Sequence, residues 1–199
     1  MNYCKIRSIK KERLKDNKEI EKKFINLNNK NIKGEKIMEI LDLYNDLGKC
    51  IGETIVRGEK TYKGKNIMLS VIFIKDSKGR YLIQKTSKKK GDRYSSTGGH
   101  VTHGENGFDT IKRELEEELS IMCDDNKIKY INTFKYPTKN CIFNVYLLEI
   151  EQLNISKIKL QKEEVAEVKF LTCEEIEDTI SHGYFLESHA YIFENFINC

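Results

Sequence analysis

The chain has 199 residues, of which 39% are hydrophobic and 33% are charged. This length suits one globular domain with an extension better than two full domains. Apolar runs fall short of the roughly 18 to 20 residues that a membrane-spanning helix needs, and Lys and Glu interrupt them near Met1 before a signal peptide could form. The composition therefore argues against a membrane protein, and we expect a soluble cytoplasmic one.

Motifs of several common classes are missing. The six cysteines are scattered without a Cys-x-x-Cys pair, which argues against a zinc knuckle or a disulfide framework and predicts reduced thiols. The sequence also has no Gly-x-Ser-x-Gly elbow, no P-loop and no Gly-x-Gly-x-x-Gly run. Serine hydrolases, P-loop NTPases and Rossmann enzymes therefore receive no support.

Positive charge is concentrated at the front of the chain. Residues 1–37 hold 12 Lys and Arg against 5 Asp and Glu, whereas residues 38–199 carry 23 against 26. We interpret the first segment as a Lys-rich N-terminal extension and the second as the folded domain, with Met38 as a conceivable alternative start. A solubilising tail is the favoured interpretation of the extension. The alternative is a basic tether for RNA, an acidic partner or a membrane surface, so nucleic acid would be bound only through residues 1–37.

Beyond Met38 the sequence alternates as short strands do. The expected strands lie at 38–44, 53–57, 67–76, 80–87, 127–134, 142–150 and 165–171. Gly79 is expected to supply the positive φ of a hairpin turn that begins at Asp76. Two helices, at about 173–181 and 186–197, close the chain, and the apolar residues of the second are available to pack against the sheet.

Residues 107–119 change to the period of an amphipathic helix. Apolar residues recur on one face of it, at Phe108, Ile111, Leu115 and Leu119. This helix is inserted between strands, and two more helices follow at the end of the chain. The order predicts an α/β fold with a mixed sheet between helical layers, an α/β/α sandwich.

Three carboxylates occupy the opposite face of this helix. Glu114, Glu117 and Glu118 stand at positions i, i+3 and i+4, so a helix places them side by side. Such a cluster is tolerated on a solvated surface, where exposed Glu is common. It is also useful where divalent cations neutralise it, because oxygen ligands at this density suit Mg²⁺ or Mn²⁺. Taken alone, the cluster favours the ordinary acidic surface.

The spacing around these glutamates resembles the Nudix box. That box reads Gly, five residues, Glu, seven residues, Arg-Glu, an aliphatic residue, any residue, Glu-Glu, any residue, Gly and an aliphatic residue. The matching positions are Gly99, Glu105, Arg113, Glu114, Leu115, Glu117, Glu118 and Ile121. With residue frequencies of roughly 5 to 10% per fixed position, an accidental match has a probability on the order of 10⁻⁵. The chain therefore resembles a Nudix hydrolase.

The resemblance extends beyond the box but not to residues 1–37. The run from Gly52 through Ser87 is similar to the front half of Nudix proteins of the isopentenyl diphosphate isomerase-like branch, and residues 163–170 look like their later strand. The fold of that family is a mixed sheet between helices. The resemblance therefore implies a Nudix-type α/β/α sandwich, in agreement with the pattern of strands and helices.

The resemblance also implies roles for individual residues. The expected ligands of Mg²⁺ or Mn²⁺ are Glu114, Glu117, Glu118 and the backbone carbonyl of Gly98. Glu105 and Arg113 would pair and, with Gly99, brace the loop of the box against its helix. Ser120 stands where the family has Gly, in a left-handed position at the helix end, and should cost about 1 kcal/mol there.

Residues outside the box are candidates for a base and for substrate contacts. The family draws its general base from the box, where Glu117 and Glu118 lie, or from a later loop, where Glu164 is our candidate. A surface carboxylate is the simpler interpretation of Glu164. Lys90 and Arg93 lie in a basic loop before the box and could bind a substrate phosphate, although a solvated loop is favoured.

These residues predict a Mg²⁺-dependent hydrolase that cleaves the pyrophosphate bond of a nucleoside diphosphate derivative or a related small molecule. The alternatives are an RNA-end pyrophosphohydrolase that uses the basic extension and a non-catalytic nucleotide-binding regulator. Isomerisation of isopentenyl diphosphate is disfavoured, because residues 94–98 contain no Cys and the chain contains no Trp. Substrate identity and oligomeric state stay open, since specificity in this fold lies outside the box.

Overall fold

The computed structural model describes residues 38–151 and 153–197. Our interpretations of residues 1–37, as a basic extension with its own partners, therefore lie outside the described residues. Ile40–Cys199 group together as one structural unit. Within the described ranges, no helix combines the length and the apolar character that crossing a membrane requires.

Strands and helices follow one another in the order that the sequence predicts. The strands are β1 (Ile40–Tyr44), β2 (Cys50–Val56), β3 (Ile67–Asp76), β4 (Tyr81–Thr86), β5 (Tyr94–Ser95), β6 (Thr97–His100), β7 (Ile128–Lys135), β8 (Cys141–Ile150) and β9 (Val165–Leu171). The helices are α2 (Gly107–Leu119), α3 (Cys173–Ser181) and α4 (Glu187–Ile192), and the π-helix η5 (Phe193–Ile197) continues α4. The expected helix at 107–119 is thus confirmed at both ends, and each expected strand is found.

The main sheet is mixed, with β3 at its centre. Its strand order is β5-β4-β3-β8-β7, while β6 pairs with β3 and β9 pairs with β4. β3 and β8 run parallel over ten residue pairs, from Ile67↔Cys141 to Asp76↔Ile150, and the other pairings are antiparallel. β1 and β2 form a separate antiparallel hairpin.

One edge of β3 is shared between two strands, and this arrangement opens the sheet. Near its C-terminal end β3 pairs with β4, whereas earlier residues, Leu69 to Ile72, pair with β6. β4 therefore diverges from β3, and its residues Gln84 and Lys85 pair with β5 instead. The divergence brings Gln84 of β4 and Thr97 of β6 together, because both strands border the gap.

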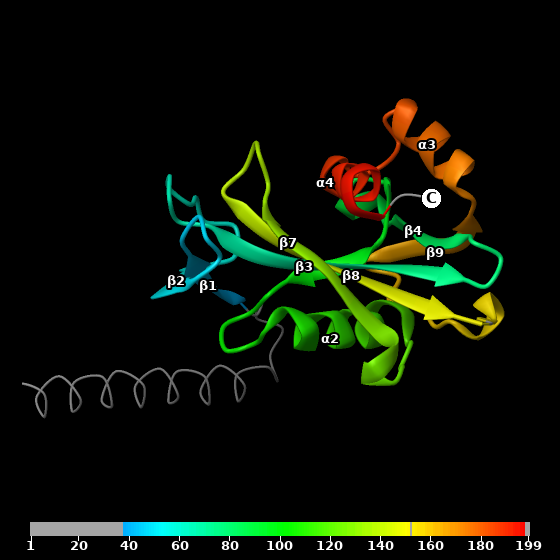
Figure 1. Ribbon diagram of the computed structural model, residues 1–199, viewed down its shortest axis with the longest axis horizontal. Coiled ribbons are helices and arrows are strands. Elements are labelled where there is room, and N and C mark those ends of the chain that lie inside the picture. The colour runs from blue at the N-terminus through cyan, green and yellow to red at the C-terminus, as the bar shows by residue number, and fades with distance from the viewer. Residues whose placement is uncertain (1–37, 152, 198–199) are drawn as a thin grey trace, which may run out of the picture. The chain divides into compact units, whose positions relative to one another are not determined.

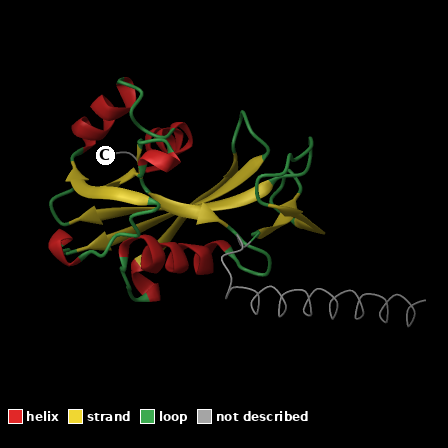
Figure 2. Ribbon diagram, turned by 180° about the vertical axis from the view of Figure 1, so that it is seen from behind, coloured by secondary structure: helices red, strands yellow, loops and turns green. Residues whose placement is uncertain are grey.

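Helices cover both faces of the sheet (Figures 1 and 2). α2 lies on one face, and α3 and α4 lie on the other. Alternate residues of β3 point to opposite faces: Ile72 and Ile74 belong to the core under α2, and Phe73 belongs to the core under α4. In that second core the Phe73 and Phe193 rings lie 5.7 Å apart, between centroids. The α/β/α layering is therefore confirmed.

The structure departs from the sequence-based expectations at a few points. β5 and β6 are not predicted, because the run from Ser95 to Gly99 has no alternating apolar residues, and pairing with β3 and β4 alone makes it extended. The last helix changes to a π-helix at Phe193. Cys50, Cys123 and Cys141 are free thiols. Cys173 is disulfide-bonded, so the expectation of reduced thiols is wrong there, because spacing along the chain does not show which thiols meet in space.

Candidate active site

The box helix α2 begins at a side-chain cap. The Asn106 side chain accepts hydrogen bonds from the backbone N–H groups of Phe108, at 2.9 Å, and of Asp109, at 3.0 Å. Such a cap satisfies two of the N–H groups that have no partner within the helix. It fixes where the helix starts, and therefore which way the glutamates further along it point.

Two glycines on β6 are required by close packing. A Cβ atom on Gly99 would lie 1.9 Å from Oε1 of Glu114, and one on Gly98 would lie 2.4 Å from the carbonyl oxygen of Ser70. A side chain at position 98 would clash with the backbone of β3, and one at position 99 would displace the Glu114 carboxylate. The box loop is therefore pressed against both the Glu114 carboxylate and β3, and this contact explains why glycines stand at these two positions.

Arg113 connects the box loop with the acidic face of α2. Its Nε donates to Oε1 of Glu105 at 2.9 Å, and its Nη2 donates to the carbonyl oxygen of His100 at 3.3 Å. Its Nη1 donates to Oε1 of Glu114 at 2.7 Å and to Oε2 of Glu117 at 3.2 Å. The structure thus brings Glu105 and Arg113 together, as the resemblance implied.

The charges of this pair stabilise one another. Burial acts to raise the pKa of Glu105, but hydrogen bonds from Arg113, Thr102 and Thr110 and the Arg113 charge lower it overall. Burial likewise acts to lower the pKa of Arg113, and Glu105 and Glu114 raise it overall. Both side chains are therefore ionised at neutral pH, and their ion pair holds the loop to the helix.

Glu118 is the most deeply buried of the three glutamates, with 8% of its surface exposed. The pKa of its carboxyl is raised to about 8, mainly by burial and in addition by the nearby charges of Glu114 and Glu164, whereas the hydrogen bond from Gln84 and the charge of Lys90 oppose the shift. Nε2 of Gln84 donates a hydrogen bond to Oε2 of Glu118 at 3.0 Å. The site thus holds a buried carboxylate with two other carboxylates close to it.

Gln84 is itself held by a neighbouring hydroxyl. Oγ1 of Thr97 donates to the Gln84 side-chain oxygen at 3.2 Å, which turns the amide nitrogen toward Glu118. Both residues are buried, and Thr97 directly precedes Gly98. Sequence reasoning missed Gln84, because only the divergence of β3 and β4 brings it to the box helix.

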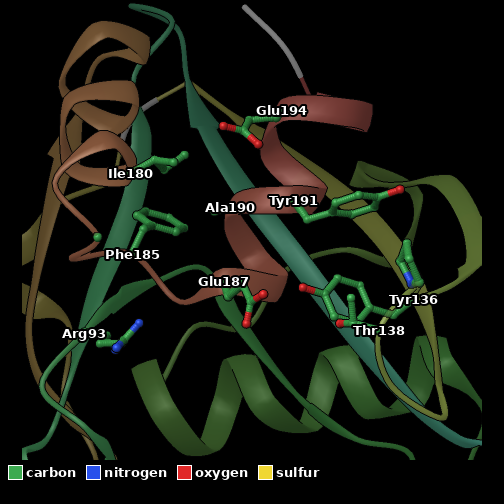
Figure 3. Close-up of a pocket in the computed structure, with 11 residues that line it drawn as sticks. Arg93, Tyr136, Thr138, Ile180, Phe185, Glu187, Ala190, Tyr191 and Glu194 are labelled. Carbon is green, nitrogen blue, oxygen red and sulfur yellow. The ribbon is translucent and has the colours of Figure 1, made fainter.

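Glu164 and Lys90 meet beside this carboxylate. Nζ of Lys90 lies 2.8 Å from Oε1 of Glu164, and both side chains are partly exposed, at 41% and 33%. The backbone N–H of Ser87 donates to the Glu164 carbonyl oxygen at 2.7 Å, which ties the basic loop to the start of β9. Arg93 is not at this ion pair; it lines a pocket on the α4 side of the sheet (Figure 3).

The donor set fits a hard divalent cation, since it consists of carboxylate oxygens and a backbone carbonyl. The buried Glu118 carboxylate, with Glu114 and Glu164 close by, is the kind of site that such a cation would neutralise. Glu117, in contrast, is exposed and turned toward Arg113. In the described part of the chain, no three acidic, His or Cys side chains are arranged as a metal-binding group. The individual ligand roles therefore stay predictions.

Ser120 adopts the left-handed conformation expected at the end of the box helix, with φ 52° and ψ 35°. The helix closes through the N–H of Ser120 to the Glu116 carbonyl and the N–H of Ile121 to the Leu115 carbonyl, both at 2.9 Å. The Ser120 hydroxyl donates to the Lys159 carbonyl oxygen at 3.2 Å. The position thus keeps the shape of a glycine cap while bearing a side chain.

Two histidines also contact the box region, and their neighbours could not be inferred from sequence. Nδ1 of His103 lies 2.7 Å from Oδ1 of Asp42, which joins the box loop to β1. His189 of α4 is buried, and its Nδ1 lies 3.0 Å from Oγ of Ser96. Burial lowers the pKa of His189 to about 4. Both contacts connect segments far apart in the chain.

Comparisons with known proteins agree with this geometry. Residues 67–195 match the NUDIX domain family. An uncharacterized Nudix hydrolase of Listeria monocytogenes is 33% identical over 162 residues, which cover 79% of this chain and 92% of that protein. A solved structure from Deinococcus radiodurans, 22% identical, superposes with a TM-score of 0.68 over 78% of this chain and 98% of that one.

A second structural neighbour is larger than this chain. It is a bifunctional NMN adenylyltransferase/ADP ribose pyrophosphatase of Francisella tularensis, solved with AMP and a Mn ion. It superposes with a TM-score of 0.53 at 20% identity, over 65% of this chain and 40% of its own. This likeness concerns the fold alone. The family match and the identity to the Listeria protein, together with the box geometry, establish that the chain belongs to the Nudix hydrolase family.

Proposed function

We propose that this hydrolase is a Mg²⁺- or Mn²⁺-dependent pyrophosphohydrolase that acts on a nucleoside diphosphate derivative or a related small molecule. The observation that carries the proposal is the buried Glu118 carboxylate beside Glu114 and Glu164. Burying a carboxyl group next to two carboxylates disfavours its ionised form, so that it holds a proton unless a cation neutralises the cluster. The site is therefore suited to a divalent cation and, through it, to the phosphate groups of a substrate.

The chain's own residues would position and neutralise the reacting groups. Glu114 and Glu118, with Glu117 and the Gly98 carbonyl, are the proposed ligands. When bound, Mg²⁺ supplies charge neutralisation for the phosphate oxygens and lowers the pKa of a coordinated water. Arg113 holds the Glu114 carboxylate in place through the 2.7 Å contact, so the ligand is oriented before the metal arrives.

Glu164 is the proposed general base. Its carboxylate is close enough to influence Glu118 and is partly exposed, so water can reach it. A base must lie within hydrogen-bonding reach of the attacking water or be linked to it by one further water. Lys90, which pairs with Glu164, would bind a substrate phosphate from the same side.

Other assignments rest on the sequence alone. The division at residue 38, the basic extension as a tail, and a cytoplasmic location stay predictions. Two fold neighbours carry pyrophosphatase chemistry in their names, the Francisella tularensis protein and a dihydroneopterin triphosphate pyrophosphohydrolase of E. coli. Their names agree with the proposed reaction type and leave the substrate open.

The test is product release from a panel of nucleoside diphosphate derivatives with Mg²⁺ and with Mn²⁺. Glu118→Gln should lower kcat by at least about a hundredfold, which corresponds to about 2.7 kcal/mol of lost transition-state stabilisation. Glu116→Gln is the matched control, because Glu116 is exposed on the same helix, and it should retain wild-type activity. Glu164→Gln should lower kcat while leaving Mn²⁺ affinity unchanged. Metal-independent turnover, or full activity of Glu118→Gln, would overturn the proposal.

A further inference from the structure

A pocket of about 480 Å³ lies between α3, α4 and the turn that joins β7 to β8. Figure 3 shows its side chains around the outer face of α4. The pocket is lined by Arg93, Tyr136, Pro137, Thr138, Ile180, Gly183, Phe185, Glu187, Ala190, Tyr191 and Glu194. A volume of this size is in the range of small-ligand sites.

Aromatic rings form a large part of the pocket lining. Tyr136 and Tyr191 lie edge to face, with ring centroids 5.4 Å apart, and Phe185 stands across the hollow from them (Figure 3). Ala190, whose side chain is small, also lines the pocket. Aromatic surfaces around such a hollow suit a flat heterocycle, because bases stack on aromatic side chains whatever their sequence.

Two carboxylates and one guanidinium line the pocket, and they make its two ends electrostatically different. Glu187 and Glu194 are seven residues apart along α4 and η5, roughly 10 Å or two helical turns, and both line the hollow. Arg93 lies at the end nearer Glu187 (Figure 3). Among the described residues, none forms an ion pair with the Arg93 guanidinium. Of the lining residues that the structure describes, Arg93 is the one cation and offsets Glu187 at its end, so a phosphate is favoured there over the end that holds Glu194.

Arg93 belongs to the loop that also carries Lys90, and this loop connects the pocket with the carboxylates of the proposed active site. Lys90 and Arg93 belong to one loop and are three residues apart, so their Cα atoms are at most about 11 Å from each other. Lys90 contacts Glu164, which lies near Glu118. The backbone of Tyr94 exchanges hydrogen bonds with Tyr184 and Leu186, at 2.9 and 2.7 Å. These bonds hold the loop against the pocket wall.

We propose that this pocket binds the nucleoside of a nucleoside diphosphate substrate and selects bases that carry an exocyclic amino group. Arg93 receives the phosphate next to the nucleoside, Glu187 accepts hydrogen bonds from the ribose hydroxyls, and Glu194 accepts a hydrogen bond from the amino group. A keto oxygen at that position would face a carboxylate without a proton between them. The inference rests on the proposed hydrolase function, since it names the class of substrate for that site.

The test measures binding of nucleoside monophosphates, which contain no pyrophosphate bond. AMP and IMP, and likewise CMP and UMP, differ by an amino group in place of a keto oxygen. Calorimetric titration of the full-length protein should show AMP and CMP binding at least about tenfold more tightly than IMP and UMP, as expected for a hydrogen bond to a charged group. Equal affinities within both pairs would overturn the proposal.

Variants test whether the preference for AMP over IMP arises in this pocket. Glu194→Gln should abolish or reverse the preference for AMP, because an amide can also donate to a keto oxygen. Glu177→Gln, on an exposed face of α3 outside the pocket, is the matched control and should keep the preference. Arg93→Ala should weaken AMP and IMP alike and leave adenosine unchanged. An unaltered preference in Glu194→Gln, or the absence of nucleotide binding, would refute the assignment.

These measurements separate the two proposals. Discrimination between AMP and IMP without any hydrolysis would support the pocket and reject the proposed reaction. Hydrolysis that is indifferent to the base, and unaffected by Glu194→Gln, would support the reaction and reject the pocket.

Discussion

Glu118→Gln should stabilise the metal-free protein while it removes activity. The wild-type carboxylate is buried near Glu114 and Glu164, whereas the amide is neutral and can still accept the hydrogen bond from Gln84. The pKa of Glu118 is raised from 4.5 to about 8. At pH 7 this shift corresponds to at most about 3 kcal/mol of lost stability. We expect the variant to recover about 1 to 3 kcal/mol, or roughly 3 to 10 °C in Tm for a domain of this size.

The pH dependence of this effect has a definite sign. Between pH 4.5 and about 8 the folded protein holds a proton on Glu118 that the unfolded chain has released. Wild-type stability should therefore fall, relative to the variant, as pH rises through this window. Below pH 4.5 the difference should vanish, because the carboxyl is protonated in both states.

Urea unfolding in EDTA, at several pH values between 4 and 8, measures the difference between the two proteins. Added Mg²⁺ should reverse the order, because a ligand held by the folded state stabilises it by about 2.7 kcal/mol at a hundred times its Kd. Glu116→Gln should follow the wild type throughout. A variant no more stable than wild type in EDTA, with the same pH dependence, would refute the reasoning from buried charge.

Three further changes test other parts of the structure. Gly99→Ala should displace the Glu114 carboxylate and so lower kcat, because the new Cβ would lie 1.9 Å from Oε1 of Glu114. Turnover and Mn²⁺ affinity check this, and wild-type values of both would contradict it. Ser120→Gly should raise stability by up to about 1 kcal/mol, since φ is 52° there, and a lower Tm would show that the hydroxyl contact matters more. The pKa of His189 is lowered from 6.5 to about 4, so the free energy of unfolding should fall by at most about 3 kcal/mol as the pH drops from 6.5 to 4. His189→Gln should reduce this pH dependence, which urea unfolding at several pH values measures. An unchanged pH dependence in the variant would contradict the prediction.

The sequence alone determined the features that depend on local spacing. The period of apolar residues placed α2 at 107–119, because burial of one helix face imposes a repeat of 3.6 residues. The resemblance to the Nudix box, which is carried by a short run of residues, implied the Glu105–Arg113 pair. The left-handed backbone at Ser120 followed in the same way, from its place at the helix end.

Tertiary structure decided which distant segments meet at the site. Gln84 reaches Glu118 only because β4 diverges from β3. The Ser96–His189 contact joins the residue between β5 and β6 to α4. The proposed base pocket combines a loop before the box, a β-turn and α4. No periodicity along the chain encodes these pairings, because they depend on strand order and on the packing of helices across the sheet. The sequence therefore determined the position of the box and its helix, and the fold decided what surrounds them.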